Sequence, residues 1–222
     1  MHSPAPLFEN REHAGRELAS ALAQHETEDC IVLAIPRGGV VIGDQVAGRL
    51  HFPMDVIVPR KIRAPQQPEL AIGAVASWGE SGRLLDKQSI AYLHVDEAYL
   101  ESETADQMAE IDRRLVTYRG TTAPPNLASR TAIVVDDGIA TGYTIEAAAL
   151  ALRTLDAGRV IIAVPVAPGD SLRRIEQSVD EVVCLHTPSP FVAVGCWYRD
   201  FEQVSDREVL DVLARFGPPD SQ

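Results

Sequence analysis

The sequence predicts an α/β protein with a doubly wound, mostly parallel central sheet. Short runs of apolar, β-branched residues alternate along the chain with longer stretches in which apolar residues recur at helical spacing. The short runs are apolar throughout, which is typical of parallel strands that helices cover on both faces. Loops of small residues follow two of these runs directly, and ligands of such sheets bind beyond the carboxyl ends of the strands. We therefore expect one domain, over residues 1–222, with a binding crevice at that edge.

Composition and charge narrow the classes of function. Of the 222 residues, 45% are hydrophobic and 23% are charged, as in ordinary globular proteins. The formal net charge of −12 argues against nucleic acid as a partner, because nucleic-acid-binding surfaces are basic. The sequence contains neither an apolar span of membrane-crossing length nor a signal-peptide pattern, so we expect a cytoplasmic protein without a membrane partner.

The N-terminal quarter is expected to begin the sheet. In chain order we predict a helix over residues 10–24, a strand over 30–35, a helix over 40–50 and a strand over 54–58. Both predicted strands are followed by a proline, Pro36 and Pro59, which has no N–H for a strand ladder.

The middle of the chain is expected to be an insertion into this sheet. The expected elements are a loop over 59–68, a hairpin with strands at 71–77 and 83–86 around a turn at 78–82, and a helical stretch over 87–119. The loop is predicted from its prolines and basic residues, and the hairpin from two apolar runs around a turn that contains glycine.

The C-terminal half is expected to complete the sheet. We predict a strand over 132–135, a helix to about 156, a strand over 160–166, a helix over 170–177, a strand over 181–185, an irregular aromatic segment over 187–204, and a final helix whose capping box begins at Ser205. The core would then comprise residues 30–58 and 130–186, with an insertion or flexible loop over 70–125 and a small hood over 187–204.

The chemistry is expected at the end of the strand over 132–135. Two carboxylates, Asp136 and Asp137, follow this strand, and the small-residue loop 138–142 leads from them into a helix. Backbone N–H groups of such a loop and of the helix start can hold a phosphate. The carboxylates can accept hydrogen bonds from vicinal hydroxyls or hold a metal. The alternative is an ordinary turn in which Thr141 caps the helix.

Residues 133–142, Ile-Val-Val-Asp-Asp-Gly-Ile-Ala-Thr-Gly, resemble the signature of the type I phosphoribosyltransferases. The resemblance implies a binding site for 5-phosphoribosyl-1-pyrophosphate (PRPP) with Mg²⁺ as cofactor. It also implies an enzyme that transfers the phosphoribosyl group to a nitrogen nucleophile, and we expect this small-molecule acceptor to be a nucleobase. A homo-oligomer is compatible with the resemblance.

The resemblance also assigns roles to the motif residues. Asp136 and Asp137 would bind the ribose hydroxyls, directly or through Mg²⁺, and stabilise the positive charge that develops on the ribose. The PRPP contacts would come from Gly138, Ile139, Ala140, Thr141, Gly142, Tyr143 and Thr144. Some family members carry an acidic base in this loop, and Ala140 occupies that place, so no general base can be assigned here.

A second loop and a lysine would complete the PRPP site. Arg37, Gly38 and Gly39 follow a predicted strand and resemble the pyrophosphate loop of the family, which implies a strained, cis Pro36–Arg37 peptide. Taken alone, Arg-Gly-Gly is commonly just a turn. Lys61 stands where the family often has a basic residue, and the alternative for its segment is a solvated loop.

The aromatic segment over 187–204 is the candidate for recognising the acceptor. Phe191 or Trp197 could stack on a nucleobase. The alternative is that these rings pack the C-terminal helix onto the sheet.

Two other functions stay open at this point. One is a protein of the same fold that senses PRPP or a nucleotide without turning it over, because fold does not determine function. The other is a phosphatase or nucleotidyl hydrolase that uses Asp136 and Asp137 as metal ligands. We rank this last, because the spacing of the two carboxylates does not match the motifs of those enzymes and the chain has no P-loop.

Overall fold

The computed structural model describes residues 5–79 and 83–217. Its centre is a five-stranded sheet in the order β2-β1-β6-β7-β8, in which all neighbouring strands are parallel. A second, three-stranded sheet in the order β3-β4-β5 is antiparallel. The elements are α1 (Arg11–Ala21), η1 (Ala23–His25), β1 (Cys30–Ala34), α2 (Gly38–Leu50), β2 (Met54–Val56), β3 (Pro59–Ala64), β4 (Gln67–Ala76), β5 (Leu84–Leu85), α3 (Lys87–Tyr92), α4 (Glu97–Arg119), β6 (Thr131–Val135), α5 (Tyr143–Thr154), β7 (Arg159–Val166), α6 (Gly169–Ile175), β8 (Glu181–His186), η2 (Val194–Trp197) and α7 (Asp206–Leu213). The predicted fold class is confirmed.

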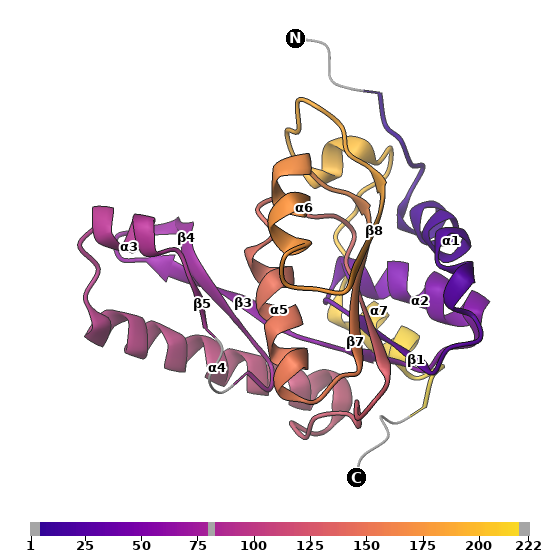
Figure 1. Cartoon of the computed structure of the whole chain (residues 1–222), viewed down its shortest axis with the longest axis horizontal. Helices are drawn as coiled ribbons and strands as arrows, with labels where there is room; N and C mark the ends of the chain where they lie inside the picture. The colour runs from indigo at the N-terminus through magenta and orange to yellow at the C-terminus, as the bar shows by residue number, and fades with distance from the viewer. Residues whose placement is uncertain (1–4, 80–82, 218–222) are drawn as a thin grey trace.

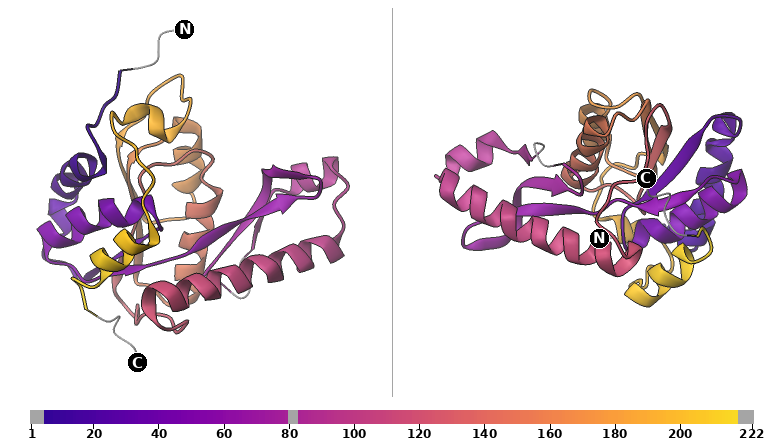
Figure 2. Two further views of the ribbon diagram at one scale, coloured as in Figure 1. Left: turned by 180° about the vertical axis from the view of Figure 1, so that it is seen from behind. Right: turned by 90° about the horizontal axis from the view of Figure 1, so that it is seen from below.

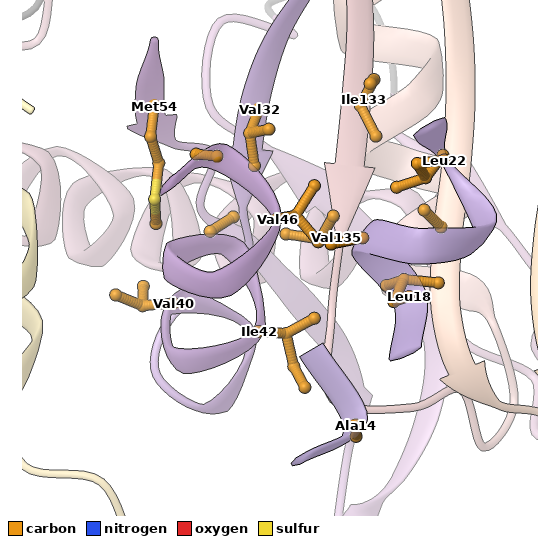
Figure 3. Packing of buried hydrophobic residues seen from close by; sticks show 14 of the residues in the cluster. Ala14, Leu18, Leu22, Val32, Val40, Ile42, Val46, Met54, Ile133 and Val135 are labelled. Carbon is orange, nitrogen blue, oxygen red and sulfur yellow. The ribbon is translucent and has the colours of Figure 1, made fainter. Parts of the chain in front are cut away.

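Helices cover both faces of the central sheet, as Figures 1 and 2 show. Alternate residues of β1 and β6 belong to different cores: Val32 and Ile133 pack with α1 and α2, whereas Leu33 and Val134 pack with α5 and α6. Figure 3 shows the first of these cores, where Leu18 of α1 and Val46 of α2 meet the sheet. Burial on both faces explains why these strands are apolar throughout.

The strand order reverses between β1 and β6. From β1 the chain proceeds outward to β2 on one side, and from β6 it proceeds through β7 to β8 on the other. The ends of β1 and β6 are aligned, because Ala34 pairs with Val135 and the Ile35 N–H donates to the Val135 carbonyl at 2.9 Å. The two loops that follow these strands therefore leave the sheet side by side, at the place where such folds bind ligands.

An arm projects from this core, made of β3, β4, β5, α3 and α4 (Figure 1). It has its own small core, in which Ile62 and Ile72 of the sheet pack against Ile111 and Leu115 of α4. The arm begins at Pro59, earlier than the insertion predicted from residue 70.

Three local predictions for the arm need correction or qualification. Residues 59–68 are not a loop, because β3 and β4 form a hairpin there whose turn contains Gln66 in the left-handed region, at φ 65°. The helical stretch over 87–119 is two helices, separated at residues 93–96, where Asp96 caps α4. The predicted pairing of strands before and after the next turn is observed between β4 and β5, although residues 80–82 of that turn lie outside the described residues.

A buried ion pair joins the arm to the central sheet. Arg119, at the end of α4, donates to the carboxylate of Asp55 in β2 at 2.8 Å, and the two side chains are 2% and 4% exposed. The same guanidinium lies 5.1 Å from the Trp78 ring and also donates to the carbonyls of Thr121 and Ala123.

Across the described residues, no helix has the length and apolar character that a bilayer crossing needs.

We expect Asp55→Ala to destabilise the protein by about 3–5 kcal/mol, because it leaves the Arg119 guanidinium buried without its carboxylate. The free energy of unfolding in urea measures this. The matched control is Asp211→Ala, which breaks an exposed pair with Arg207 and should cost at most about 1 kcal/mol. Equal losses for the two variants would mean that the buried pair does not anchor the arm.

Candidate functional site

The two adjacent aspartates lie at the end of β6, against the loop that follows β1. A side chain at Gly38 would place its Cβ 1.9 Å from Oδ2 of Asp137, and one at Gly39 would lie 2.7 Å from the Val135 carbonyl. At Gly39 the neighbouring atoms are backbone, so a Cβ is excluded, whereas at Gly38 a Cβ would displace the Asp137 carboxylate from its contact with Arg11. The structure thus brings the Arg37-Gly38-Gly39 loop and the aspartate pair into one site. Its Pro36–Arg37 peptide is cis, as the family resemblance implies.

Two residues that the sequence analysis missed hold Asp137 in place. Arg11, in the first turn of α1, donates from Nε to Asp137 Oδ2 at 2.8 Å. Its guanidinium also donates to the Glu202 carbonyl at 2.7 Å and lies 3.8 Å from the centre of the Phe201 ring. The Tyr198 hydroxyl donates to the Asp137 carbonyl at 2.6 Å. These partners come from the two ends of the chain, so local spacing could not reveal them.

The environment of the pair raises the pKa of both carboxyls. Burial, and then the nearby charge of Asp137, raise the pKa of Asp136 well above its ordinary value. Burial also raises the pKa of Asp137, although Arg11 opposes this shift. Asp136 accepts the Asp137 N–H at 2.8 Å, which partly compensates its charge. Two raised carboxyl pKa values in one crevice are more common at functional sites than in a structural turn.

The loop after the aspartates is shaped by helix α6. The Ser171 hydroxyl donates to the Ala140 carbonyl at 2.9 Å, and the Arg174 guanidinium donates to the Thr141 carbonyl. Because a trans peptide holds its C=O and N–H on opposite sides, the N–H groups of Thr141 and Gly142 point away from α6. Two consecutive donors are thus directed away from α6, and Gly142, at φ 82°, leads directly into α5.

Two of the residues predicted to contact PRPP have hydrogen-bond partners within the protein instead. The Ile139 N–H donates to the Val166 carbonyl at 2.9 Å and the Ile139 side chain is buried, so its predicted contact with phosphate is wrong for the N–H. The Tyr143 hydroxyl donates to Asp86 in the arm at 3.2 Å rather than facing the loop. Thr144 lies in the first turn of α5 and is half-buried. Fewer groups of this loop are therefore available to a phosphate than the sequence motif suggests.

Of the two predicted basic contacts, Arg37 belongs to the loop after β1 and Lys61 belongs to the arm. The Arg37 side chain points toward α7, where Nη1 lies 3.8 Å from Asp206, so Arg37 does not face the aspartates. Lys61 is exposed on β3 and pairs with Ala74, which packs toward α5. Lys61 is thus on the α5-facing side of the arm, within a strand rather than a loop.

The aromatic segment is divided between packing and exposure. Trp197 is 6% exposed and Phe191, whose ring centre lies 6.0 Å away, is half-buried, so the packing interpretation holds for Trp197. Among the described residues, Trp197 Nε1 has no hydrogen-bond partner. The segment also borders the loop, because a Cβ at Gly138 would lie 2.7 Å from Val194 Cγ1.

A comparison with protein-family models matches residues 7–199 to the phosphoribosyl transferase domain. Two Mycobacterium tuberculosis proteins, from strains CDC 1551 / Oshkosh and H37Rv, carry the name "Putative phosphoribosyl transferase". Each is 44% identical over 210 residues, which cover 94% of this chain and 47% of the relative. The chain therefore spans about half the length of these curated relatives. Among solved structures, TT1426 from Thermus thermophilus is similar, at 41% identity and a TM-score of 0.79, covering 94% of this chain and 98% of that one.

We expect Ser171→Ala and Arg174→Gln to weaken the binding of ribose 5-phosphate, each by roughly three- to tenfold, because one hydrogen bond contributes about 1 kcal/mol. Titration calorimetry measures the affinity. Arg173→Gln is the matched control on α6, because the Arg173 side chain is exposed and pairs with Asp170. An effect of Arg173→Gln as large as that of Arg174→Gln would remove the positioning role from Arg174.

We expect Asp136→Asn to raise the melting temperature at about pH 8, with a difference from wild type that shrinks toward about pH 4. Because the folded-state pKa is raised, the contribution of Asp136 to stability is present at low pH and is lost as the pH rises through that pKa. Melting curves at several pH values measure the difference. Asp106→Asn, at an exposed carboxylate on α4, should leave the profile unchanged. If the stability of Asp136→Asn depended on pH in the same way as that of the wild type, the raised pKa of Asp136 would be refuted.

Proposed function

Since the chain belongs to the phosphoribosyl transferase domain family, we propose that it binds PRPP and transfers the 5-phosphoribosyl group to a ring nitrogen of a nucleobase, with release of pyrophosphate. The observation that carries this proposal is the contact of Gly38 with Asp137, because it joins the two loops into one site. This function is proposed for the present chain alone, because the chain covers only about half the length of its curated relatives.

Each part of PRPP has a matching part of the crevice. The 5′-phosphate would accept hydrogen bonds from the N–H groups of Thr141 and Gly142 and from the start of α5, whose helix dipole favours an anion. The ribose hydroxyls would donate to Asp136 and Asp137. The pyrophosphate would lie along the backbone of the Arg37-Gly38-Gly39 loop, which the two glycines let pack directly against Asp137 and Val135.

The reaction needs charge stabilisation at the ribose more than it needs a strong base. The bond from C1 to the pyrophosphate oxygen breaks, pyrophosphate leaves with the electron pair, and the acceptor nitrogen forms the new bond to C1 and loses its proton to solvent. Asp136 and Asp137 would stabilise the positive charge that develops on the ribose. Arg11 and the Tyr198 hydroxyl hold Asp137 in position for this role.

The residues at this site fit Mg²⁺ bound together with the substrate. Among the described residues there is no group of three or more histidine, cysteine, aspartate or glutamate side chains that could hold a metal alone. Mg²⁺ commonly uses one or two carboxylates plus substrate phosphates and water, and Asp136 and Asp137 can supply the carboxylates. When bound, Mg²⁺ would neutralise charge on the pyrophosphate and make it a better leaving group.

The hood segment supports a neutral, planar acceptor. Residues 187–198 contain no charged side chain, and Val194 lies against Gly138 beside the aspartates. An apolar wall next to the ribose site can cover the face of a nucleobase. Phe191, which is half-buried, is the better candidate for this contact than Trp197.

A second candidate is a protein that binds PRPP as a signal without turnover. Ala140 favours it, because a methyl group occupies the place where some relatives of the fold carry an acidic base. Ala140 is exposed and its carbonyl is held by Ser171.

Calorimetry with PRPP and Mg²⁺, followed by an assay of pyrophosphate release over a panel of nucleobases, decides between the two. We expect binding and release with at least one base. Asp137→Asn should lower release by roughly 100-fold or more, because it removes charge at the ribose, while an asparagine oxygen can still accept from Arg11. Asp106→Asn is the control. Binding without release for every base would favour the sensor, and absence of PRPP binding would refute both functions.

A further inference from the structure

A second basic site lies behind the Pro36–Gly39 loop. A cleft of about 320 Å³ opens between this loop, helix α4 and the start of α7. Its lining includes Arg37, Arg113, Arg114, Thr117, Tyr118 and Asp206, and we call it the arginine cleft. In a chain with a net charge of −12, three arginines around one small opening form an unusual local concentration of positive charge.

The carboxylates nearby do not neutralise these arginines. Glu110 accepts from Arg113 at 2.7 Å and from Arg114 at 2.8 Å, so two guanidinium groups share one carboxylate. The hydrogen bonds to Arg113 and then to Arg114 lower the pKa of Glu110 to about 2, which keeps it ionised. Even with Glu110 charged, the pair of arginines retains one positive charge.

The remaining carboxylate is already engaged. Asp206 accepts the Tyr118 hydroxyl at 2.5 Å, and its distance of 3.8 Å from Arg37 Nη1 is too long for a hydrogen bond. The cleft therefore contains three guanidinium groups against two carboxylates, and Arg37 has donors to spare.

A fourth arginine adds to the excess charge. Arg60, on β3, donates from Nε to the neutral amide oxygen of Gln107 at 3.0 Å. Burial, and then the neighbouring charge of Arg114, lower the pKa of Arg60. This repulsion between guanidinium groups persists within the protein, and a bound anion would relieve it.

We propose that the arginine cleft binds a small polyphosphate anion, at a site separate from the aspartate crevice. A guanidinium group can bind a phosphate through two parallel N–H···O hydrogen bonds. Arg113 and Arg114 are adjacent on α4, and Arg37 lies across the cleft. The volume suits a chain of two or three phosphates. Thr117 and Tyr118 line the same opening, but their hydroxyls already donate to the Arg113 carbonyl and to Asp206, so the donors for an anion are the arginines.

The cleft and the crevice share one loop but use opposite sides of it. The Gly38 backbone faces Asp137, whereas the Arg37 side chain faces α4 and α7. An anion in the arginine cleft would thus contact the loop from behind and could alter how the loop meets a ligand at Asp137. The proposal does not depend on whether the crevice turns over PRPP.

The test is titration calorimetry of the whole chain with inorganic tripolyphosphate. We expect Arg113→Gln/Arg114→Gln to weaken binding at least tenfold, Arg113→Lys/Arg114→Lys to retain part of the affinity, and Arg207→Gln to bind like the wild type. Arg207 is the matched control because it is 90% exposed on α7, next to the cleft. The lysine variant keeps the test decisive if the glutamine variant fails to fold.

Three outcomes would overturn the proposal. They are an absence of tripolyphosphate binding to the wild type, equal affinity of the wild type and the glutamine variant, and complete displacement of tripolyphosphate by saturating PRPP. The last result would mean that tripolyphosphate and PRPP share one site, which contradicts the proposed separation. A parallel titration with a nucleoside triphosphate identifies the source of the phosphates, because a tighter affinity than that of tripolyphosphate indicates a nucleotide tail and an equal one indicates free polyphosphate.

Discussion

The candidate site depends on the close approach of a glycine backbone to a carboxylate. Because β1 and β6 are adjacent and end in register, Gly38 meets Asp137 with no room for a Cβ. This contact requires glycines after one strand and an acid after the other, and it requires a counter-charge, which Arg11 supplies. The burial that draws the two strands together also raises the pKa values of both aspartates. The close packing of the two loops and the raised pKa values of the aspartates therefore have the same cause.

The sequence predicted the central sheet well because its signal is local. Strands buried on both faces are apolar throughout, and glycine loops mark their ends, so β1, β6 and β7 could be located within a residue or two. The topology of parallel sheets predicted that the loops after β1 and β6 lie at one edge, whereas the contact of Gly38 with Asp137 was not predicted. Helix α7 was predicted from its capping box, which the structure contains.

What the sequence could not predict comes from contacts distant along the chain. Arg11 and Tyr198 reach Asp137 from opposite termini, and no spacing rule links them. The sequence pattern predicts a loop where β3 and β4 form a hairpin, because prolines and basic residues obscure the strand pattern. Strand pairing and packing in the core of the arm decide the conformation. Ser171 and Arg174 were overlooked for a similar reason. Their role is to donate hydrogen bonds to the carbonyls of Ala140 and Thr141, and no sequence pattern reveals these contacts.

The bond between Tyr143 and Asp86 connects the arm to the first residue of α5. Tyr143 is also stacked under the Arg174 guanidinium, 4.7 Å from its ring centre, so the same side chain touches the helix that orients the loop. Because the acceptor is a carboxylate, a hydrogen bond of this kind contributes about 1.5–3 kcal/mol. This hydrogen bond adds to the packing of Ala74 and Ala76 of β4 in the core that contains α5, so both polar and apolar contacts join the arm to α5. A partner that displaced the arm at Asp86 would therefore act on the start of α5 and, through Arg174, on the loop over 138–142.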